Sequence, residues 1–156
     1  MQQIGKNYLM RGTRVETLNE NIIATVAAIT ARSLGINKKT PSNMDSFMEM
    51  LQVHGIIVDV VDDTEWFHVT NAGCINNTIL IPDGLYARIC KGEHEAVFIF
   101  FHELGHLLLG HKPLLHHSDT EPTRHEDSEW QADEFSKCML RIMKIKYIPE
   151  QLCLHF

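Results

Sequence analysis

The sequence has no CxxC pair, no long hydrophobic run and no excess of positive charge. Its four cysteines are widely spaced, which argues against a zinc ribbon or a thioredoxin-like redox site and favours reduced thiols. Lysine and arginine together number 14, against 20 aspartate and glutamate residues, and the net charge is −6. The chain therefore lacks the basic face that binding to nucleic acid phosphates requires, and we expect no direct nucleic acid partner.

The sequence also shows no targeting signal and no membrane-spanning segment. The first 14 residues are polar, without the apolar stretch of a signal peptide, and the most apolar early stretch, residues 22–31, is too short to span a bilayer. We therefore expect a cytoplasmic protein without a membrane partner. A length of 156 residues with 44% hydrophobic and 22% charged residues predicts one globular domain, residues 1–156, rather than a fibrous or disordered chain.

The hydrophobic periodicity predicts an α+β fold, because helical patterns flank a short region of strand patterns. The polar turns between the strands favour a small antiparallel meander of three strands. Residues 85–92 fit no single pattern. The predicted segments are a loose arm at 1–13, helices within 14–55 (14–34 and 42–53), a sheet within 56–81 (strands 56–61, 66–70 and 78–81), and two long helices at 93–111 and 128–146.

The helix predicted at 93–111 carries three polar residues in an apolar surrounding. It should be buried on most faces, yet it contains His102, Glu103 and His106. Isolated buried charges are costly, and one bound metal ion would account for all three groups. His102 and His106 lie about 40° apart on a helix and one turn apart, so both imidazoles can reach one ion. This HExxH spacing predicts two metal ligands and, in Glu103, a general base.

A catalytic zinc site needs a third protein ligand. The metzincin pattern fails, because Leu109 and Lys112 stand where it requires glycine and histidine. His111 follows His106 by about 140° around a continuous helix, so we expect it to face elsewhere. His116, His117 and His125 are competing ligands, but they lie in a predicted polar loop and are expected to be solvated.

The helix predicted at 128–146 offers a better third ligand. Glu129 and Asp133 lie one turn apart on one face. Glu129 could complete a His₂Glu site, and Asp133 could accept the second N–H of a ligand histidine. Spacing alone leaves an alternative open, because acidic residues near a helix N-terminus are also favoured by the helix dipole without any metal.

The remaining catalytic groups are less defined. Tyr86, His94 and Tyr147 are candidates for stabilising an oxyanion, and simple packing or exposure is the alternative for each. An extended substrate could add to the edge of the sheet along residues 78–81.

Two motifs together resemble the ImmA/IrrE family of metallo-endopeptidases. They are Phe101-His-Glu-Leu-Gly-His-Leu-Leu-Leu-Gly-His111 and Glu129-Trp-Gln-Ala-Asp-Glu-Phe135, and the resemblance covers roughly residues 50–145. It implies a zincin-like fold with one Zn²⁺ per chain, held by His102, His106 and Glu129. It also implies that Glu103 is the general base and that Asp133 supports a ligand histidine. The implied substrate is a helix-turn-helix transcriptional repressor of a phage or mobile element.

Two other functions remain open on the sequence. One is a non-proteolytic regulator that keeps the zinc fold and acts by binding a partner. The other is a hydrolase of a different amide, or a toxin-like component of a two-gene module. A His₂Glu set favours zinc over manganese without deciding between them.

Overall fold

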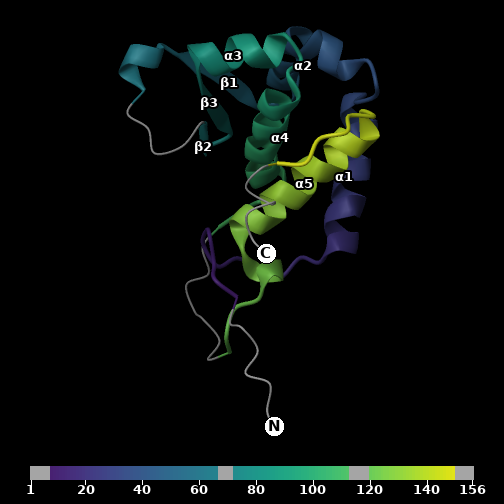
Figure 1. The fold of residues 1–156 in the computed structure, drawn as a ribbon, viewed down its shortest axis with the longest axis vertical. Helices are drawn as coiled ribbons and strands as arrows, with labels where there is room; N and C mark the ends of the chain where they lie inside the picture. Colours follow the sequence, from purple (N-terminus) through teal and green to yellow (C-terminus); the bar gives the residue numbers. More distant parts are fainter. Residues whose placement is uncertain (1–7, 67–71, 113–119, 150–156) are drawn as a thin grey trace.

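The structure, a computed structural model, describes residues 8–66, 72–112 and 120–149. Within these residues the chain forms five α-helices and one three-stranded sheet, which confirms the predicted α+β class (Figure 1). The helices are α1 (Glu20–Leu34), α2 (Met44–Met50), α3 (Asp83–Cys90), α4 (His94–Leu108) and α5 (Ser128–Ile142), and the strands are β1 (Ile57–Val61), β2 (Gly73–Ile75) and β3 (Thr78–Pro82).

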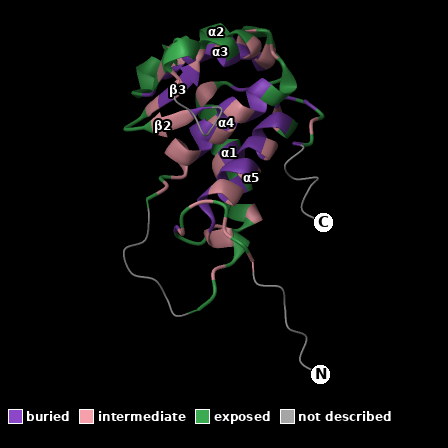
Figure 2. Cartoon of the chain, turned by 60° about the vertical axis from the view of Figure 1, so that its left-hand side comes forward, coloured by how far each residue is buried: buried purple, intermediate pink, exposed green. Residues whose placement is uncertain are grey.

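Helix α4 lies at the centre of the molecule. It contacts α5, α3 and β2, and α1 packs against α5 (Figure 1). Buried residues gather along α4 and on one face of α5 (Figure 2), as expected for a single hydrophobic core that both helices share. None of the described helices has the length and apolar character that a membrane span needs.

The first predicted helix begins later than the periodicity indicated. Helix α1 starts at Glu20 because the Asn19 side chain accepts a hydrogen bond from the Ile22 N–H and caps the first turn. Before it, Val15 and Leu18 donate backbone hydrogen bonds to the segment that leads into α5. Residues 14–18 are therefore not helical, and long-range backbone pairing takes the place of helical bonds at Val15 and Leu18.

The second predicted helix, 42–53, is present in three pieces. A 3₁₀ turn at Thr40–Asn43 precedes α2, and a second 3₁₀ turn at Leu51–His54 follows it. Pro41 lies at the start of the first turn, where its missing N–H is tolerated. The segment ends at Gly55, which adopts the left-handed conformation at φ 78°.

The sheet is mixed, so the predicted antiparallel meander is wrong. The strand order is β1-β3-β2, with β1 parallel to β3 and β2 antiparallel to β3. A tight turn at Asn76-Asn77, with φ values of 51° and 63° that suit a hairpin, joins β2 to β3. Of the strand predicted at 66–70, residues 67–70 lie outside the described residues. Because β3 lies between β1 and β2, the first two strands in sequence do not pair with each other.

The ambiguous segment after the sheet is helical, and both long helices are shorter than predicted. Helix α3 begins directly after Pro82, which fixes an extended conformation before the first turn. Helix α4 ends at Leu108 instead of residue 111, and Gly110 then adopts φ 63°. Helix α5 ends at Ile142 instead of residue 146.

Helices α4 and α5 approach each other closely at a glycine. A Cβ atom on Gly105 would lie 3.0 Å from the ring of Phe135, which is fully buried. Directly after Phe135, the Ser136 hydroxyl donates a 2.7 Å hydrogen bond to the carbonyl of Phe98, which lies two turns before Gly105 on α4. The two contacts fix the distance between the helices and hence the positions of the polar residues on their facing surfaces.

We expect Gly105→Val to lower the free energy of unfolding by about 2 kcal/mol, because the added methyl groups must displace a ring that has no free space. Helix propensity alone would slightly favour valine over glycine. The measurement is urea denaturation, with Ala28→Val on the exposed face of α1 as the control. A variant as stable as the wild type would show that the α4–α5 contact is not tight.

Candidate metal centre

The three predicted ligands meet at one point between α4 and α5. His102 and His106 project from the same face of α4, and Glu129 faces them from the first turn of α5. The two Nε2 atoms are 3.2 Å apart, and the Glu129 carboxylate oxygens lie 2.8 Å from His102 Nε2 and 3.2 Å from His106 Nε2. The structure thus brings together a His₂Glu group that could hold a metal ion.

The distances among the two Nε2 atoms and the Glu129 carboxylate oxygens suit a small divalent ion. Tetrahedral ligand atoms at about 2.0–2.2 Å from zinc lie roughly 3.3–3.5 Å from one another. The observed separations are slightly shorter, so a small outward movement of the ligands would reach that geometry. The donor set of two imidazoles and one carboxylate with a further open side is the one that catalytic zinc sites use.

Glu129 reaches this position because of how α5 begins. Asp127 is the N-cap residue, and its carboxylate accepts a 3.0 Å hydrogen bond from the Glu129 backbone N–H. Asp127 is fully buried. The start of the helix, and with it the first-turn glutamate, is therefore fixed by a group that cannot move into solvent.

The electrostatics of the cluster show strong mutual attraction. Burial alone would lower the pKa of His102, but its hydrogen bonds to Asp133 and Glu129 outweigh burial and raise the pKa to about 10. For Glu129, burial acts to raise the pKa, and the hydrogen bonds from His102 and His106 lower it overall. In the metal-free protein these hydrogen bonds thus join the same side-chain atoms that would bind a cation.

Asp133 lies where the sequence predicted it. Its Oδ1 is 2.7 Å from His102 Nδ1, so the carboxylate accepts the second N–H of this ligand. Its Oδ2 accepts a 2.8 Å hydrogen bond from the Arg11 guanidinium. Both carboxylate oxygens are therefore bonded, and the His102 ring is oriented with Nε2 toward Glu129.

His111 does not face elsewhere, and that prediction is wrong. Because α4 ends at Leu108 and Gly110 turns the backbone, the His111 N–H bonds to the His106 carbonyl and the chain folds back. His111 Nδ1 lies 2.8 Å from His106 Nδ1, and His111 Nε2 lies 2.7 Å from Gln131 Oε1. Burial lowers the pKa of His111 to about 4, so its ring is neutral at pH 7. A sequence reading that extends the helix past Gly110 could not find this contact.

Glu103 lies beside the ligands and is almost fully buried. Burial raises its pKa, and repulsion by Glu129 acts in the same direction, although the nearby imidazoles oppose it. The thiol of Cys74, on β2, hydrogen-bonds to the Glu103 carboxylate, and burial raises the pKa of that thiol to about 11. The spacing of the cysteines could not predict the contact between Cys74 and Glu103, because this contact depends on how β2 packs against α4.

The N-terminal segment packs against the metal centre from outside. The Asp127 carboxylate accepts hydrogen bonds from the Tyr8 hydroxyl and from the backbone N–H groups of Arg11 and Gly12. Gly12 lies so close to α5 that a Cβ there would stand 2.4 Å from Ser128 Oγ and 2.7 Å from Glu129 Cγ. Residues 8–13 of the arm that we expected to be loose thus hold the α5 N-terminus and touch a ligand side chain.

The competing ligands lie elsewhere or outside the described residues. His125 contacts Glu20 through Nε2 at 3.1 Å and meets the Trp130 ring edge to face, and His116 and His117 fall within the undescribed residues 113–119. Of the oxyanion candidates, Tyr86 hydrogen-bonds to Cys90 on α3, and His94 is exposed at the start of α4. The Tyr147 ring packs at a tilt against Phe98, with 5.8 Å between the ring centroids, and Phe98 lies one helical turn before His102.

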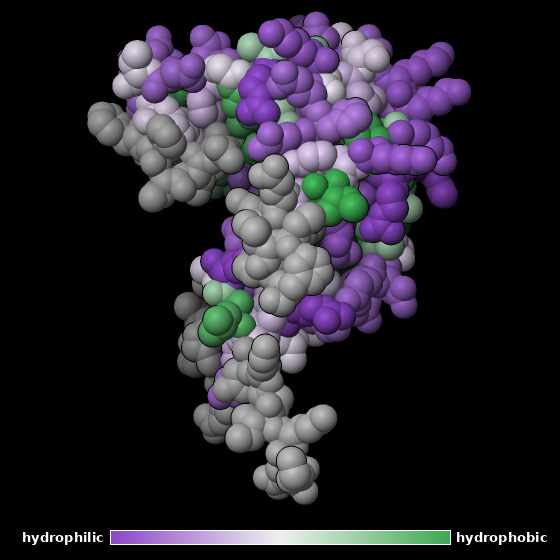
Figure 3. All heavy atoms as spheres, viewed as in Figure 1, coloured by the Kyte–Doolittle hydropathy of each residue, from purple (hydrophilic) through white to green (hydrophobic). Residues whose placement is uncertain are grey.

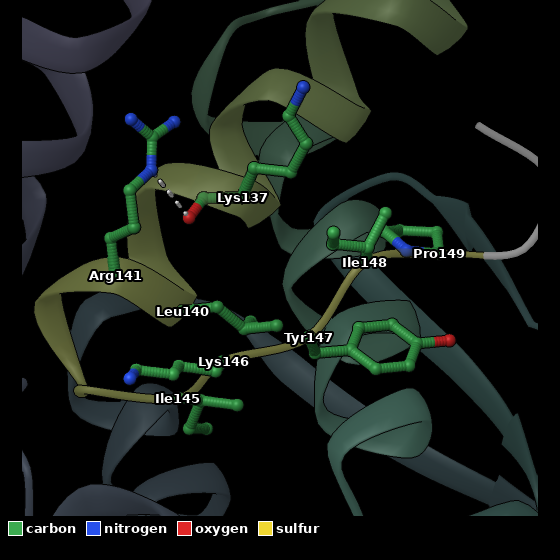
Figure 4. Close-up of a pocket in the computed structure, with 8 residues that line it drawn as sticks. All are labelled: Lys137, Leu140, Arg141, Ile145, Lys146, Tyr147, Ile148 and Pro149. Atoms are coloured by element: carbon green, nitrogen blue, oxygen red, sulfur yellow. Dashed lines mark hydrogen bonds between the residues drawn. The ribbon is translucent and has the colours of Figure 1, made fainter. Parts of the chain in front are cut away.

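A groove of about 800 Å³ lies at the other end of α5 (Figure 4). It separates the last turns of the helix from the segment that turns back after it, and an apolar patch over α5 is visible among hydrophilic side chains in Figure 3. Its lining includes cations but no histidine or carboxylate, so it lacks metal ligands and a general base. The lining residues are Lys137, Leu140, Arg141, Ile145, Lys146, Tyr147, Ile148 and Pro149.

The comparisons with known proteins give no relative. No protein-family model matches the chain, and no curated protein or solved structure matches it. The resemblance to the ImmA/IrrE family therefore rests on the two motifs alone and stays a prediction.

We expect Gly12→Ala to weaken binding of a divalent cation, because the new methyl group must displace either the arm or the Glu129 side chain. A loss of roughly 10–100-fold in affinity is typical when a group that supports a ligand is disturbed. The measurement is competition for Zn²⁺ with a chromogenic chelator.

The matched control is Gly73→Ala, since a Cβ at Gly73 meets no other atom within 4 Å. Equal Zn²⁺ affinity for Gly12→Ala and the wild type would show that the arm does not position Glu129.

Proposed function

We propose that the protein is a zinc-dependent endopeptidase that hydrolyses a peptide bond in a protein substrate. The observation that carries this proposal is the convergence of His102, His106 and Glu129 with Glu103 buried directly beside them. Two imidazoles and a carboxylate form a zinc-type donor set, and a carboxylate next to the first histidine is the usual proton acceptor of such sites.

The chemistry follows from the positions of these groups. A zinc ion bound there would polarise the scissile carbonyl and lower the pKa of an attacking water. Glu103 accepts a proton from that water as its oxygen bonds to the carbonyl carbon, and it then donates the proton to the leaving nitrogen as the C–N bond breaks. The raised pKa of Glu103 suits a group that must both accept and return a proton near neutral pH.

The edge of the sheet near this site is β2, which corrects the predicted docking of substrate along residues 78–81. Strand β3 is central and pairs with β1 on one side and β2 on the other. Strand β2 pairs only with β3 among the described residues, and its Cys74 touches Glu103. An extended substrate strand that paired with β2 would therefore pass beside the general base.

The substrate that we propose is a helix-turn-helix transcriptional repressor. The support for this is the resemblance of the HELGH and ExxAD motifs to the ImmA/IrrE family, since the site geometry defines the reaction and not the substrate.

Metal binding is the first test. Metal-free protein titrated with Zn²⁺ in a calorimeter should bind one ion per chain, and the melting temperature should rise because the ion binds only the folded state. We expect Glu129→Gln and His106→Ala to lose more affinity than the roughly 10–100-fold that loss of a supporting hydrogen bond costs. His125→Ala is the control. Binding that survives in both ligand variants would contradict the proposed site.

Glu103→Gln tests catalysis separately from metal binding. This variant should keep its Zn²⁺ affinity. It should cleave a helix-turn-helix repressor from a neighbouring gene about 10²–10⁴-fold more slowly than the wild type, because no carboxylate accepts the proton from water. Mass spectrometry of the products measures the cleavage, and chelation of zinc should abolish it.

Equal cleavage by the variant and the wild type would exclude Glu103 as general base. If neither protein cleaves the repressor but both bind it with equal affinity, the chain is a non-proteolytic regulator.

A further inference from the structure

The side chain of Gln131 has only one possible orientation. It is fully buried on α5, and its Nε2 lies 2.8 Å from the Glu16 carbonyl and 2.6 Å from the His125 carbonyl. Carbonyl oxygens only accept hydrogen bonds, so the NH₂ group must face them. The amide oxygen of Gln131 is thereby turned toward His111.

This orientation determines where His111 carries its proton. The Gln131 oxygen is 2.7 Å from His111 Nε2 and can only accept, so Nε2 carries the hydrogen. In the neutral ring the other nitrogen, Nδ1, then has a free lone pair. That lone pair lies 2.8 Å from His106 Nδ1, which must therefore be the donor in their contact.

The last step reaches the metal centre. His106 Nε2 lies 3.2 Å from both His102 Nε2 and the Glu129 carboxylate, which accepts a hydrogen bond from it in the absence of a metal ion. Because the relay places a hydrogen on Nδ1, Nε2 is the ring nitrogen that must give up its hydrogen and present its lone pair when a metal ion binds. Among the described residues, His106 Nδ1 has no carboxylate partner like the Asp133 carboxylate that serves His102.

We propose that Gln131 and His111 form a hydrogen-bond relay that fixes His106 in its Nδ1–H tautomer and aims its Nε2 lone pair at the metal ion. The proposal rests on the metal site of the proposed function and is independent of peptide cleavage. His111 and Gln131 are positioning residues, and the relay ends on backbone carbonyls that no substitution removes. The two histidines are thus oriented by different partners. The Nδ1–H of His102 bonds to the charged Asp133 carboxylate, and that of His106 bonds to the neutral His111 ring.

The tautomer of His106 can be read directly. In ¹⁵N-labelled, metal-free wild-type protein at about pH 8–9, where an ordinary imidazole is neutral, the ring nitrogen shifts should report hydrogen on Nδ1 of His106. His111→Phe keeps a ring of similar size but has no acceptor, so we expect a mixture of both His106 tautomers and a roughly 10–100-fold lower Zn²⁺ affinity by chelator competition.

Two further variants separate the relay from general packing. His111→Gln retains an acceptor and a donor, and it should restore the Nδ1–H tautomer and most of the Zn²⁺ affinity. His54→Phe removes an exposed histidine outside the relay, and it should leave the His106 tautomer unchanged.

The relay is overturned if Nδ1 of wild-type His106 carries no hydrogen, a result that needs no variant to fold. It is also overturned if His111→Phe leaves both tautomer and affinity unchanged. If wild-type His106 shows the expected tautomer but the protein binds no Zn²⁺, the relay stands as a structural feature and the proposed function fails.

Discussion

The fully buried carboxylate of Asp127 is the contact on which the candidate site depends. It accepts hydrogen bonds from the Tyr8 hydroxyl and from the backbone N–H groups of Arg11, Gly12 and Glu129. A buried carboxylate without such partners would be strongly unfavourable, so these four bonds compensate the cost of burying it. By giving this carboxylate its partners, the fold brings two segments more than 100 residues apart to the point where Glu129 faces α4.

Charge balance explains why a cation suits the place where α4 and α5 face each other. Glu103, Glu129 and Asp133 are carboxylates in or beside the cluster, and Arg11 is the one guanidinium that pairs with them among the described residues. With neutral imidazoles this leaves two negative charges in a largely buried region, which is unfavourable without compensation. In the metal-free protein a proton on His102 compensates one of these two negative charges, and a divalent ion would compensate both.

The sequence predicted the parts of the site that lie within single helices. The spacing of His102 and His106, and that of Glu129 and Asp133, follows from helix geometry, so residue type and periodicity were sufficient. The sheet was predicted wrongly, because parallel pairing of β1 with β3 is a long-range choice that local turns do not encode. His111 and Gly12 were missed for a related reason. One depends on a backbone reversal at Gly110, and the other on contact with a distant segment.

The contacts of the N-terminal arm link metal affinity to the folding of that arm. Arg11 bonds to the carboxylate that orients His102, and Gly12 touches Glu129, so an ordered arm favours the geometry that binds an ion. Coupling between two binding events is reciprocal, and an ion held by His102 and Glu129 must therefore stabilise the ordered arm by the same free energy. The Gln131 amide strengthens this link, because one of its two carbonyl partners belongs to Glu16 in the segment that follows the arm. The segment before α1 is thus part of the metal centre in energetic terms, although none of the three ligand atoms comes from it.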